Sequence, residues 1–569
     1  MKERTTDLVL RTIKETGVRH VFGITGGAIT NQLDAFSRDN DVQFISMVQE
    51  QGAAMAVEAY SRLRGYGVAM ATSGPGGTNL VTGIAGCYMD SIPALFITGQ
   101  VSRFDLRTNN IRQKGFQELN MCGVISPVTK YSQMVMTPDL LPEMMGEAMR
   151  SSLSGRMGPV HLDIPMDIQQ VEIESVNVDW RVSRRVEKVD MTKVKELISR
   201  AERPVLILGN GVRLGEAGEL AYELATKLKW PVFPSWAYAD FLHENRIDLF
   251  GVYGNRGANF GVQNSDLILS IGSRLDTRMT GSKPVNFARE AKKIIVDIDK
   301  GEIMKGSVVP DLPIETDARS FITSMLADMP KSKDVSGWLK KCREWRDRYP
   351  NVTLDDFKEL NPYSVSRIIS NEAKERDIIV PESGGNLSWI MQSWEWKRGQ
   401  RLVNDFGNSS MGYSLPAAIG AYFATGRAPI CIAGDGGIQM NIQELQTIVN
   451  YKIPIKIFVY SNEGYGIIRQ FQDLYLGGRH VGTHEGTPDF AKVAEAYGIK
   501  AMRIDDVTKV KAQIKEAMNY NGAILVDIRM NPNSIIKPRA IFGKPIEEQH
   551  PFLTDEETNS NLIVKRWQT

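Results

Sequence analysis

Short apolar segments alternate with helix-like stretches along almost the whole chain, and this alternation constrains the fold more than any other feature of the sequence. Continuous apolar runs joined by helices are typical of buried strands in parallel sheets. The sequence therefore predicts an α/β protein built from doubly wound parallel sheets. The apolar segments form three sets: 18–24, 42–48, 66–72 and 93–99; then 204–209, 230–235, 266–273 and 292–298; then 377–383, 429–435, 453–461 and 523–529.

Chain length and two polar stretches divide this pattern into domains. With 569 residues the chain is too long for a single hydrophobic core. Residues 175–192 are polar and predict a linker, and a second linker follows a charged helical region at 336–350. The first and third sets of segments could be distant copies of one unit. We predict three domains and a tail, at 1–175, 190–330, 355–535 and 536–569.

The composition argues against several functional classes. There are 68 basic and 67 acidic residues, a formal net charge of +1, whereas a nucleic-acid or membrane-surface binder needs a basic excess or patch. The four cysteines form no C-x-x-C pair, so we expect no disulfide framework and a cytoplasmic location. The first residues lack the apolar core of a signal peptide, and no run of about 18 apolar residues could span a membrane.

The segment from 428 to 466 carries the most specific motif. Gly434-Asp435-Gly436 ends one apolar segment, and after 25 further residues Asn462 ends the next. A helix at 441–449 is predicted between the two segments. In a right-handed crossover both strand ends lie at one edge of the sheet, where a carboxylate and an amide oxygen suit Mg²⁺. Gly434, Gly436 and Gly437 would let backbone N–H groups approach a diphosphate at the start of a helix.

This motif resembles the GDG-x(25–30)-N signature of the thiamine diphosphate enzymes. GDG alone is also found at ordinary strand-to-helix turns, whereas GDG with the spaced Asn is far more specific. The family usually has Asn-Asn where this chain has Ser461-Asn462. The resemblance implies that Asp435, Asn462 and the backbone carbonyl of Gly464 hold Mg²⁺.

A second segment, EQGAAMAVEAYSR at 50–62, resembles the catalytic-Glu segment of the same family. A Glu at a helix N-terminus can also be a simple capping charge. The resemblance implies that the Glu50 carboxyl binds ring nitrogen N1′ of the cofactor and activates it. In this family that Glu and the metal site come from different subunits, so we expect at least a homodimer, with a homotetramer left open.

Two further segments resemble cofactor-binding parts of the family. In NSSMGYSLPAAIGA, Met411 matches the apolar side chain that supports the bent cofactor, although a lone Met is also ordinary core packing. The carbonyl of Ser409 would accept the cofactor's amino group. Gly384-Gly385-Asn386 matches the diphosphate loop, where close relatives have Gly-Gln-His.

Within the family, the chain most resembles the catalytic subunit of acetolactate synthase, over roughly residues 4–535. The matching segments include FGITGGAI, TSGPGGTNLVTGIAGCYMDSIPALFITGQV, FQELNMCGVISPVTK and SRLDTRMTG. The resemblance implies pyrimidine-binding, central FAD-type and diphosphate-binding domains, in that order. It also implies that pyruvate loses CO₂ and that the remaining hydroxyethyl (acetyl) unit is transferred to a second carbonyl, such as a 2-keto acid. Residues expected at the reacting centre are Gly27, Gln117, Phe116 and Lys130.

The central domain resembles the flavin-binding domain of acetolactate synthase. The resemblance implies that FAD is bound in a structural role, with Arg278 between the flavin and the acceptor substrate. Glycine turns such as Gly209 to Gly211 are common after strands, so the segment SRLDTRMTG is the stronger sign of the flavin-binding domain. The residues expected to contact the flavin are Gly209, Gly211, Arg278 and Asp297.

The acceptor region departs from the family. Phe471 stands where these synthases have a Trp that selects larger 2-keto acids, Gln49 replaces the usual His before Glu50, and the tail differs. A changed tail with an unchanged cofactor site favours an alternative: the same donor chemistry with a nucleotide-linked keto sugar as acceptor, as in branched-chain surface-sugar biosynthesis. The six histidines include no adjacent pair, which favours carboligation over aldehyde release. A flavin-redox pyruvate oxidase and a non-catalytic scaffold of this fold remain further alternatives.

Overall fold

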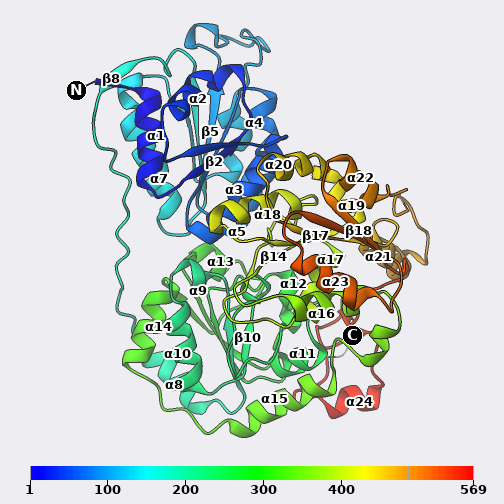
Figure 1. Ribbon diagram of the computed structural model, residues 1–569. Coiled ribbons are helices and arrows are strands. Elements are labelled where there is room, and N and C mark those ends of the chain that lie inside the picture. The colour runs from blue at the N-terminus through cyan, green and yellow to red at the C-terminus, as the bar shows by residue number, and fades with distance from the viewer. Residues whose placement is uncertain (1, 485, 568–569) are drawn as a thin grey trace.

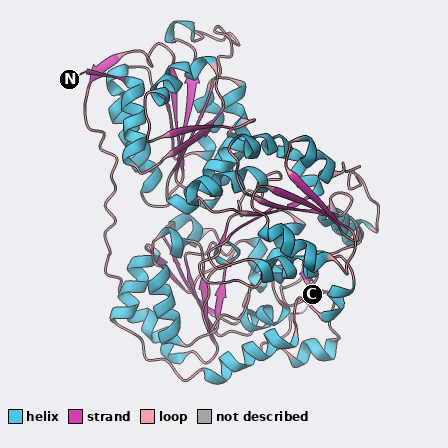
Figure 2. Cartoon of the chain, viewed as in Figure 1, coloured by secondary structure: helices cyan, strands magenta, loops and turns pink. Residues whose placement is uncertain are grey.

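The computed structural model describes residues 2–484 and 486–567, and it contains three parallel sheets, each with helices on both faces (Figures 1 and 2). The predicted fold class, three doubly wound α/β domains, is confirmed. Strands form at all twelve apolar segments, because each is a continuous run that can be buried on both faces of a sheet. The strands of the three sheets lie within the predicted domain ranges, whose boundaries stay a prediction.

The N-terminal sheet has six parallel strands in the order β3-β2-β4-β5-β7-β6. Beside it, β1 and β8 form a short antiparallel pair. The strands are β1 Lys2–Arg4, β2 His20–Gly23, β3 Gln43–Ser46, β4 Gly67–Ala71, β5 Ala94–Gln100, β6 Tyr131–Met134, β7 Pro159–Pro165 and β8 Glu172–Glu174. The α-helices are α1 Thr5–Glu15, α2 Thr30–Ser37, α3 Glu50–Arg64, α4 Pro75–Asn79, α5 Val81–Asp90, α6 Met121–Ile125 and α7 Leu141–Leu153.

The central sheet has five parallel strands in the order β10-β9-β11-β12-β13. Its strands are β9 Pro204–Leu208, β10 Val232–Pro234, β11 Leu267–Ile271, β12 Lys292–Asp297 and β13 Leu312–Glu315. The helices of this region are α8 Thr192–Arg200, α9 Gly211–Leu214, α10 Gly218–Leu228, α11 Arg256–Gln263, α12 Thr277–Thr280, α13 Lys300–Met304, α14 Ala318–Ala327 and α15 Ser336–Arg348.

The C-terminal sheet again has six parallel strands, in the order β15-β14-β16-β17-β19-β18. With β14 to β19 in place of β2 to β7, this is the strand order of the N-terminal sheet. The shared order supports the interpretation of the first and third sets of apolar segments as copies of one unit. The strands are β14 Ile378–Pro381, β15 Arg401–Leu402, β16 Ile430–Gly434, β17 Lys456–Ser461, β18 Lys500–Ile504 and β19 Ile524–Arg529. The helices include α16 Pro362–Glu372, α17 Gly385–Ser393, α18 Ser414–Thr425, α19 Asp435–Ile438, α20 Leu445–Asn450, α21 Gly466–Leu476, α22 Phe490–Ala496 and α23 Val510–Asn519.

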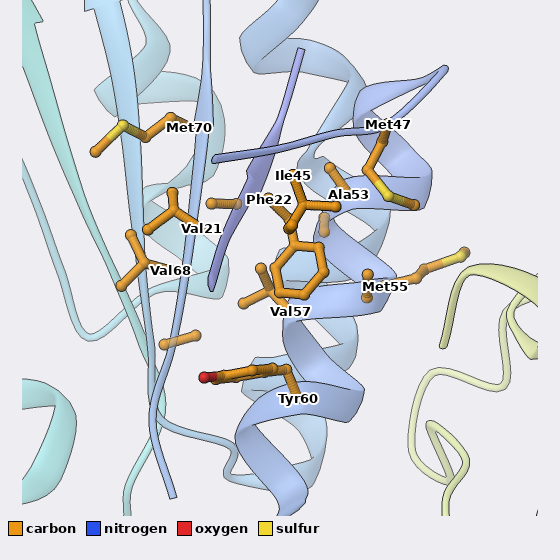
Figure 3. Close-up of a cluster of buried hydrophobic side chains, with 14 of the residues drawn as sticks. Val21, Phe22, Ile45, Met47, Ala53, Met55, Val57, Tyr60, Val68 and Met70 are labelled. Carbon is orange, nitrogen blue, oxygen red and sulfur yellow. The ribbon is translucent and has the colours of Figure 1, made fainter. Parts of the chain in front are cut away.

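Helix α3 is the buried element that joins the two six-stranded units. On one side, Val57 and Tyr60 of α3 face Val21, Phe22 and Val68 of the N-terminal sheet (Figure 3). On the other side α3 packs against α18, so closely that a Cβ at Gly420 would lie 2.0 Å from the Ala56 carbonyl oxygen. Small residues at this crossing therefore set the position of Glu50, the first residue of α3.

One predicted element is wrong in detail: the helix at 441–449 is not continuous. A 3₁₀ helix at Gln439–Glu444 precedes α20, and Asn441 has a non-helical φ of −135°. The side chain of Asn441 donates a hydrogen bond to the carbonyl of Gly412 at 2.9 Å. A side-chain bond to a distant carbonyl competes with regular helix geometry, so tertiary contact overrides the local helical pattern here.

The tail is built into the molecule and packs on the central domain. It contains a short antiparallel ribbon of β20 Arg539–Ala540 and β21 Gln549–His550, followed by α24 Asp555–Ser560. Ile546 is buried in the central hydrophobic cluster. Glu547 pairs with Arg289 at 2.8 Å, and both side chains are buried or nearly so. The tail thus connects the C-terminal sheet to the central domain, and its helix α24 lies near the end of α15 (Figure 1).

In the part of the chain that the structure describes, no helix is long and apolar enough to cross a membrane.

Candidate active site

The Asp435 and Asn462 motif lies at the carboxyl edge of the C-terminal sheet, as its spacing predicts. Strands β16 and β17 are parallel neighbours, so the residues that follow them lie side by side. The Asp435 carboxylate accepts hydrogen bonds from the backbone N–H of Gly464 at 3.1 Å and of Gly436 at 2.8 Å. Burial raises the pKa of the Asp435 carboxyl, whereas these N–H groups oppose the rise. A nearby cation would stabilise the charged form further.

Glycines line this edge because no side chain fits there. A Cβ at Gly436 would lie 2.4 Å from the Tyr465 ring, and a Cβ at Gly437 would lie 2.6 Å from the Glu382 side chain. Gly464 has φ +118°, a conformation that L side chains rarely adopt. The backbone at Gly436 and Gly437 therefore packs directly against the Tyr465 and Glu382 side chains.

Two polar side chains at the same edge lack partners. The Ser383 hydroxyl and the Oδ1 atom of Asn386 are buried and have no hydrogen-bond partner among the described residues. Buried polar groups usually have a hydrogen-bond partner, so a buried group without one requires an explanation. Ser383 directly precedes the predicted diphosphate loop, and Asn386 belongs to that loop and to the first turn of α17.

A cavity of 310 Å³ opens at this edge. It joins the C-terminal sheet to the central domain, from which Trp236 and Tyr253 contribute aromatic walls that the sequence did not predict. The predicted residues that line it are Arg278, Gly384, Gly385, Asn386, Ser409, Met411, Gly434, Asp435, Gly436, Gly437, Asn462 and Gly464. Twelve residues predicted from separate motifs thus meet around one space.

The buried carboxylate of Glu382 orders the loop that carries Ser409 and Met411. It accepts hydrogen bonds from the backbone N–H groups of Gly412 and Tyr413 and from the Ser414 hydroxyl at 2.8 Å. Burial raises the pKa of Glu382. The role of Glu382 was not predicted from the sequence, because its partners in this loop are 30 or more positions away. Its only sequence signal was its place directly after a buried strand.

Glu50 does not line this cavity. Its carboxylate accepts a hydrogen bond from the Asn79 amide at 3.0 Å and is half-buried. Gln49, which replaces the expected His, caps α3 by accepting from the backbone N–H groups of Gln51 and Gly52. Glu444, fully buried in the C-terminal unit, accepts from the N–H of Gln49 at 3.0 Å. Glu444 therefore positions the segment that carries Glu50. Like the role of Glu382, this role was not predicted from the sequence.

The other residues expected at the reacting centre lie in the N-terminal domain, outside the cavity of their own chain. Gly27 is exposed at the edge of the sheet after β2. Gln117 has φ +63°, and its neighbour Phe116 is 85% exposed. Lys130 is not directed to the cavity: its ammonium donates to the Ser151 and Ser154 carbonyls at the end of α7. Within this chain Lys130 caps a helix, and burial lowers its pKa.

A second cavity of 470 Å³ lies between the N-terminal and central domains. Gly211, Arg278 and Asp297 line it, as expected for the central domain, whereas Gly209 does not. Gly209 has a packing role, because a Cβ there would lie 2.0 Å from the Gly272 carbonyl oxygen. Residues 182–186 of the predicted linker also form part of the wall.

Arg278 and Trp236 line both cavities and so stand between them. The Arg278 guanidinium lies 5.3 Å from the Trp236 ring centroid and 3.5 Å from the Ser409 hydroxyl. The Trp236 indole N–H is buried and has no partner among the described residues. The two cavities are therefore neighbours that share one wall.

Phe471 lies on α21, one helix turn beyond the cavity lining. Its ring contacts those of Tyr475 and Phe542, and the Arg539 guanidinium lies 3.8 Å from its centroid. Phe471 itself does not line the cavity, whereas Ile467 and Ile468 of the same helix do. The predicted pocket residue thus forms a second layer behind the wall.

Comparison with known families matches all three domains of the chain. Residues 3–124 match the N-terminal TPP binding domain of thiamine pyrophosphate enzymes. Residues 191–325 match the central domain of these enzymes, and residues 382–528 match their C-terminal TPP binding domain.

Curated relatives match over nearly the whole chain. The acetolactate synthase large subunit of Porphyra purpurea is 34% identical, over 94% of this chain and 93% of its own length. A probable acetolactate synthase large subunit of Methanocaldococcus jannaschii is 36% identical, over 92% of each chain. The acetolactate synthase large subunit of Lactococcus lactis is 31% identical, over 95% of each chain. The protein therefore belongs to the thiamine diphosphate-dependent enzymes and, within them, to the acetolactate synthase-like catalytic subunits.

Proposed function

We propose that this carboligase uses Mg²⁺-bound thiamine diphosphate to decarboxylate pyruvate and to transfer the two-carbon unit to a second carbonyl compound. The observation that carries the proposal is the meeting of Asp435, Asn462 and Gly464 at one sheet edge, beside a glycine-lined cavity of 310 Å³. Mg²⁺ is usually bound by one or two carboxylates and keeps its other coordination positions for phosphate oxygens and water. One carboxylate with neutral oxygens nearby therefore suits this ion.

The residues at this edge fit a metal-bound diphosphate. Asp435 would supply a carboxylate oxygen, Asn462 its amide oxygen and Gly464 its backbone carbonyl. The unpartnered Ser383 hydroxyl could donate to a phosphate oxygen. Gly434, Gly436 and Gly437 also line the cavity, so backbone at the start of α19 can approach the same anion, which helix N-termini favour.

When bound, thiamine diphosphate supplies an electron sink for the bond that pyruvate breaks on losing CO₂. The chain's own residues orient and protect it. Met411 lies in the cavity wall, where it would support the bent cofactor, and the Ser409 carbonyl would accept its amino group. The Glu50 carboxyl would hold a proton at pyrimidine nitrogen N1′.

Because Glu50 lies outside the cavity of its own chain, we infer that a second copy supplies it. Gly27, Gln117 and Phe116 would then cover the reacting centre from that copy. The 85% exposure of Phe116 supports an arrangement in which a partner covers this face. A homodimer is the smallest assembly that completes the site, and a homotetramer of two such dimers would also do so.

We infer that the 470 Å³ cavity holds FAD in a structural role. Asp297 at the end of β12 and Gly211 at the start of α9 take the places that the family resemblance gives to flavin contacts. The unpartnered Trp236 indole N–H between the two cavities supports a ligand there. Release of FAD on denaturation, measured by its visible absorbance, tests this part of the proposal.

The acceptor has two candidates. A 2-keto acid follows from the named relatives, which are acetolactate synthases. A nucleotide-linked keto sugar is favoured by Phe471 in place of Trp and by the different tail. Incubation of the enzyme with pyruvate, thiamine diphosphate, Mg²⁺ and FAD separates them. Rapid formation of acetolactate from pyruvate alone supports the 2-keto acid, whereas slow formation that a keto sugar outcompetes supports the sugar.

A further inference from the structure

Among the described residues, the guanidinium of Arg539 has no charged partner although it is buried close to the 310 Å³ cavity. The residue is 1% exposed, and its Nε and Nη1 atoms have no hydrogen-bond partner among the described residues. Removing a cation from water is unfavourable unless it is paired or hydrogen-bonded. An unpaired guanidinium in the interior therefore points to a ligand that pairs with it.

Two aromatic rings frame this guanidinium. It lies 3.8 Å from the ring centroid of Phe471 and 5.5 Å from that of Tyr253. The Tyr253 ring lines the cofactor cavity, and Phe471 follows the two isoleucines of α21 that also line it. The guanidinium thus lies directly behind the cavity wall, on the side where the tail meets the central domain.

The position of Arg539 is fixed by three segments of the chain. The backbone N–H of Ala540 donates to the Val252 carbonyl at 2.7 Å. The Gln392 amide donates to the carbonyls of both Tyr253 and Pro538 at 2.9 Å. These bonds hold the tail against Tyr253, whose ring covers the Arg539 guanidinium. The position of the guanidinium is therefore fixed by the surrounding structure.

The charge around Tyr253 favours an anion. Burial raises the pKa of Tyr253, and the guanidinium groups of Arg539 and Arg278 both oppose that rise. Neither arginine forms an ion pair with a carboxylate in the part of the chain that the structure describes. Two cations without carboxylate partners, both close enough to lower the pKa of Tyr253 at the cavity wall, create a positive potential that attracts an anionic substrate.

We propose that Arg539 is a specificity-determining residue that binds the anionic group, carboxylate or phosphate, of the acceptor substrate. The proposal rests on the carboligase function proposed above. A planar guanidinium can donate two parallel hydrogen bonds to either anion. Arg539 does not line the cavity in this conformation, whereas Tyr253 does, so the anion reaches it when the Tyr253 ring moves aside.

The test compares anionic with neutral acceptors in Arg539→Gln and Arg539→Lys. Acceptors are 2-ketobutyrate, a phosphorylated aldehyde and the neutral acetaldehyde, and CO₂ release from pyruvate reports the donor step. For Arg539→Gln we expect KM for the matching anionic acceptor to rise roughly 10- to 100-fold, with partial rescue by Lys. KM for acetaldehyde and the rate of CO₂ release should change by less than about twofold, because neither needs this cation.

The set of acceptors whose KM rises in Arg539→Gln shows which anionic group Arg539 binds. A loss confined to 2-ketobutyrate identifies a carboxylate, and a loss confined to the phosphorylated aldehyde identifies a phosphate. Equal losses for neutral and anionic acceptors, or no change for any of them, would overturn the proposal. Lys537→Gln, in the same tail and half-exposed, is the matched control and should behave as wild type.

Two additional measurements keep the result interpretable. Direct binding of 2-ketobutyrate and of inorganic phosphate, followed by tryptophan fluorescence, tests Arg539 without turnover, and unchanged affinity for both in Arg539→Gln counts against it. Absence of CO₂ release from pyruvate in the wild type would instead refute the proposed function. Circular dichroism checks that each variant is folded, and if Arg539→Gln does not fold, the charge-preserving Lys variant must still bind the anion.

Discussion

The buried carboxylate of Glu444 accepts a hydrogen bond of 3.0 Å from the backbone N–H of Gln49, the residue that precedes Glu50. The bond joins the C-terminal unit to the N-terminal one across 395 positions of the sequence. The same carboxylate also accepts from the N–H of Val48 and from the Thr447 hydroxyl. Glu50 therefore owes its position to a residue on the far side of the domain boundary.

Replacement of Glu444 by Gln should lower kcat without abolishing cofactor binding. An amide keeps one acceptor but places an NH₂ group against N–H donors, which loosens the first turn of α3. We expect kcat to fall roughly 10- to 100-fold, because small displacements of catalytic groups have effects of that size. Affinity for thiamine diphosphate should change little. The exposed Glu495→Gln is the control, and an unaltered kcat in Glu444→Gln would argue against a positioning role.

Replacement of Asp435 by Asn should remove Mg²⁺-dependent cofactor binding. The variant keeps the shape of the side chain but loses the one carboxylate of the proposed metal site. We expect affinity for thiamine diphosphate at fixed Mg²⁺ to fall by roughly 100-fold or more. Quenching of tryptophan fluorescence is a suitable measurement, since Trp389 and Trp236 line the cavity. The exposed Asp355→Asn should bind as wild type does; equal affinity in Asp435→Asn would exclude the proposed metal site.

Two inactive variants should restore activity when their subunits are mixed. Glu50→Gln and Asp435→Asn each damage a different half of a site that we propose is shared between two copies. A mixed dimer then contains one site with both residues intact. After unfolding and refolding together, random pairing should give roughly a quarter of wild-type activity per subunit. Sites completed within one chain would give no recovery, and the two variants assayed separately provide the baseline.

The buried Asp163 should make the N-terminal domain less stable as pH rises. Burial raises the pKa of its carboxyl from 3.8 to about 7, although Thr98 and Gln100 donate hydrogen bonds to it. The folded state therefore holds a proton that the unfolded state releases. The contribution of this proton to the free energy of unfolding is fully present below pH 3.8 and is lost as pH rises through about 7. Its slope is at most about 1.4 kcal/mol per pH unit.

The measurement for Asp163 compares thermal unfolding of the wild type and Asp163→Asn at pH 5 and pH 8. The advantage of wild type over the variant should shrink by a few degrees between these pH values. Burial lowers the pKa of neighbouring His161 to about 3, an effect of opposite sign that both proteins share. A difference in unfolding temperature that stays constant with pH would show that Asp163 is ionised in the folded state.

Much of the fold could be predicted from the sequence because its signals are local. Buried parallel strands such as β16 and β17 are continuous apolar runs, and residues after them are brought together by sheet topology alone. Asp435, Asn462 and the glycines between them are therefore visible without coordinates. The break at Asn441 was not visible, because its cause is a bond to Gly412.

The residues missed in the site share one property: their partners are far away in the chain. Glu382 orders the Met411 loop, Glu444 orders the Glu50 segment, and Arg539 contacts Phe471 from the tail. A Glu or Arg without a motif reads as a surface charge, since most such residues are exposed. Only burial and hydrogen-bond partners distinguish these three from the rest.

The most direct test of the proposed carboligase chemistry is the release of CO₂ from pyruvate by the purified enzyme with and without thiamine diphosphate and Mg²⁺, in wild type and in Glu50→Gln. We expect CO₂ release that requires both additions and that falls roughly 100-fold or more in the variant, because the proton relay at N1′ is lost. Turnover that persists after complete removal of the cofactor, or that is unchanged in Glu50→Gln, would contradict it.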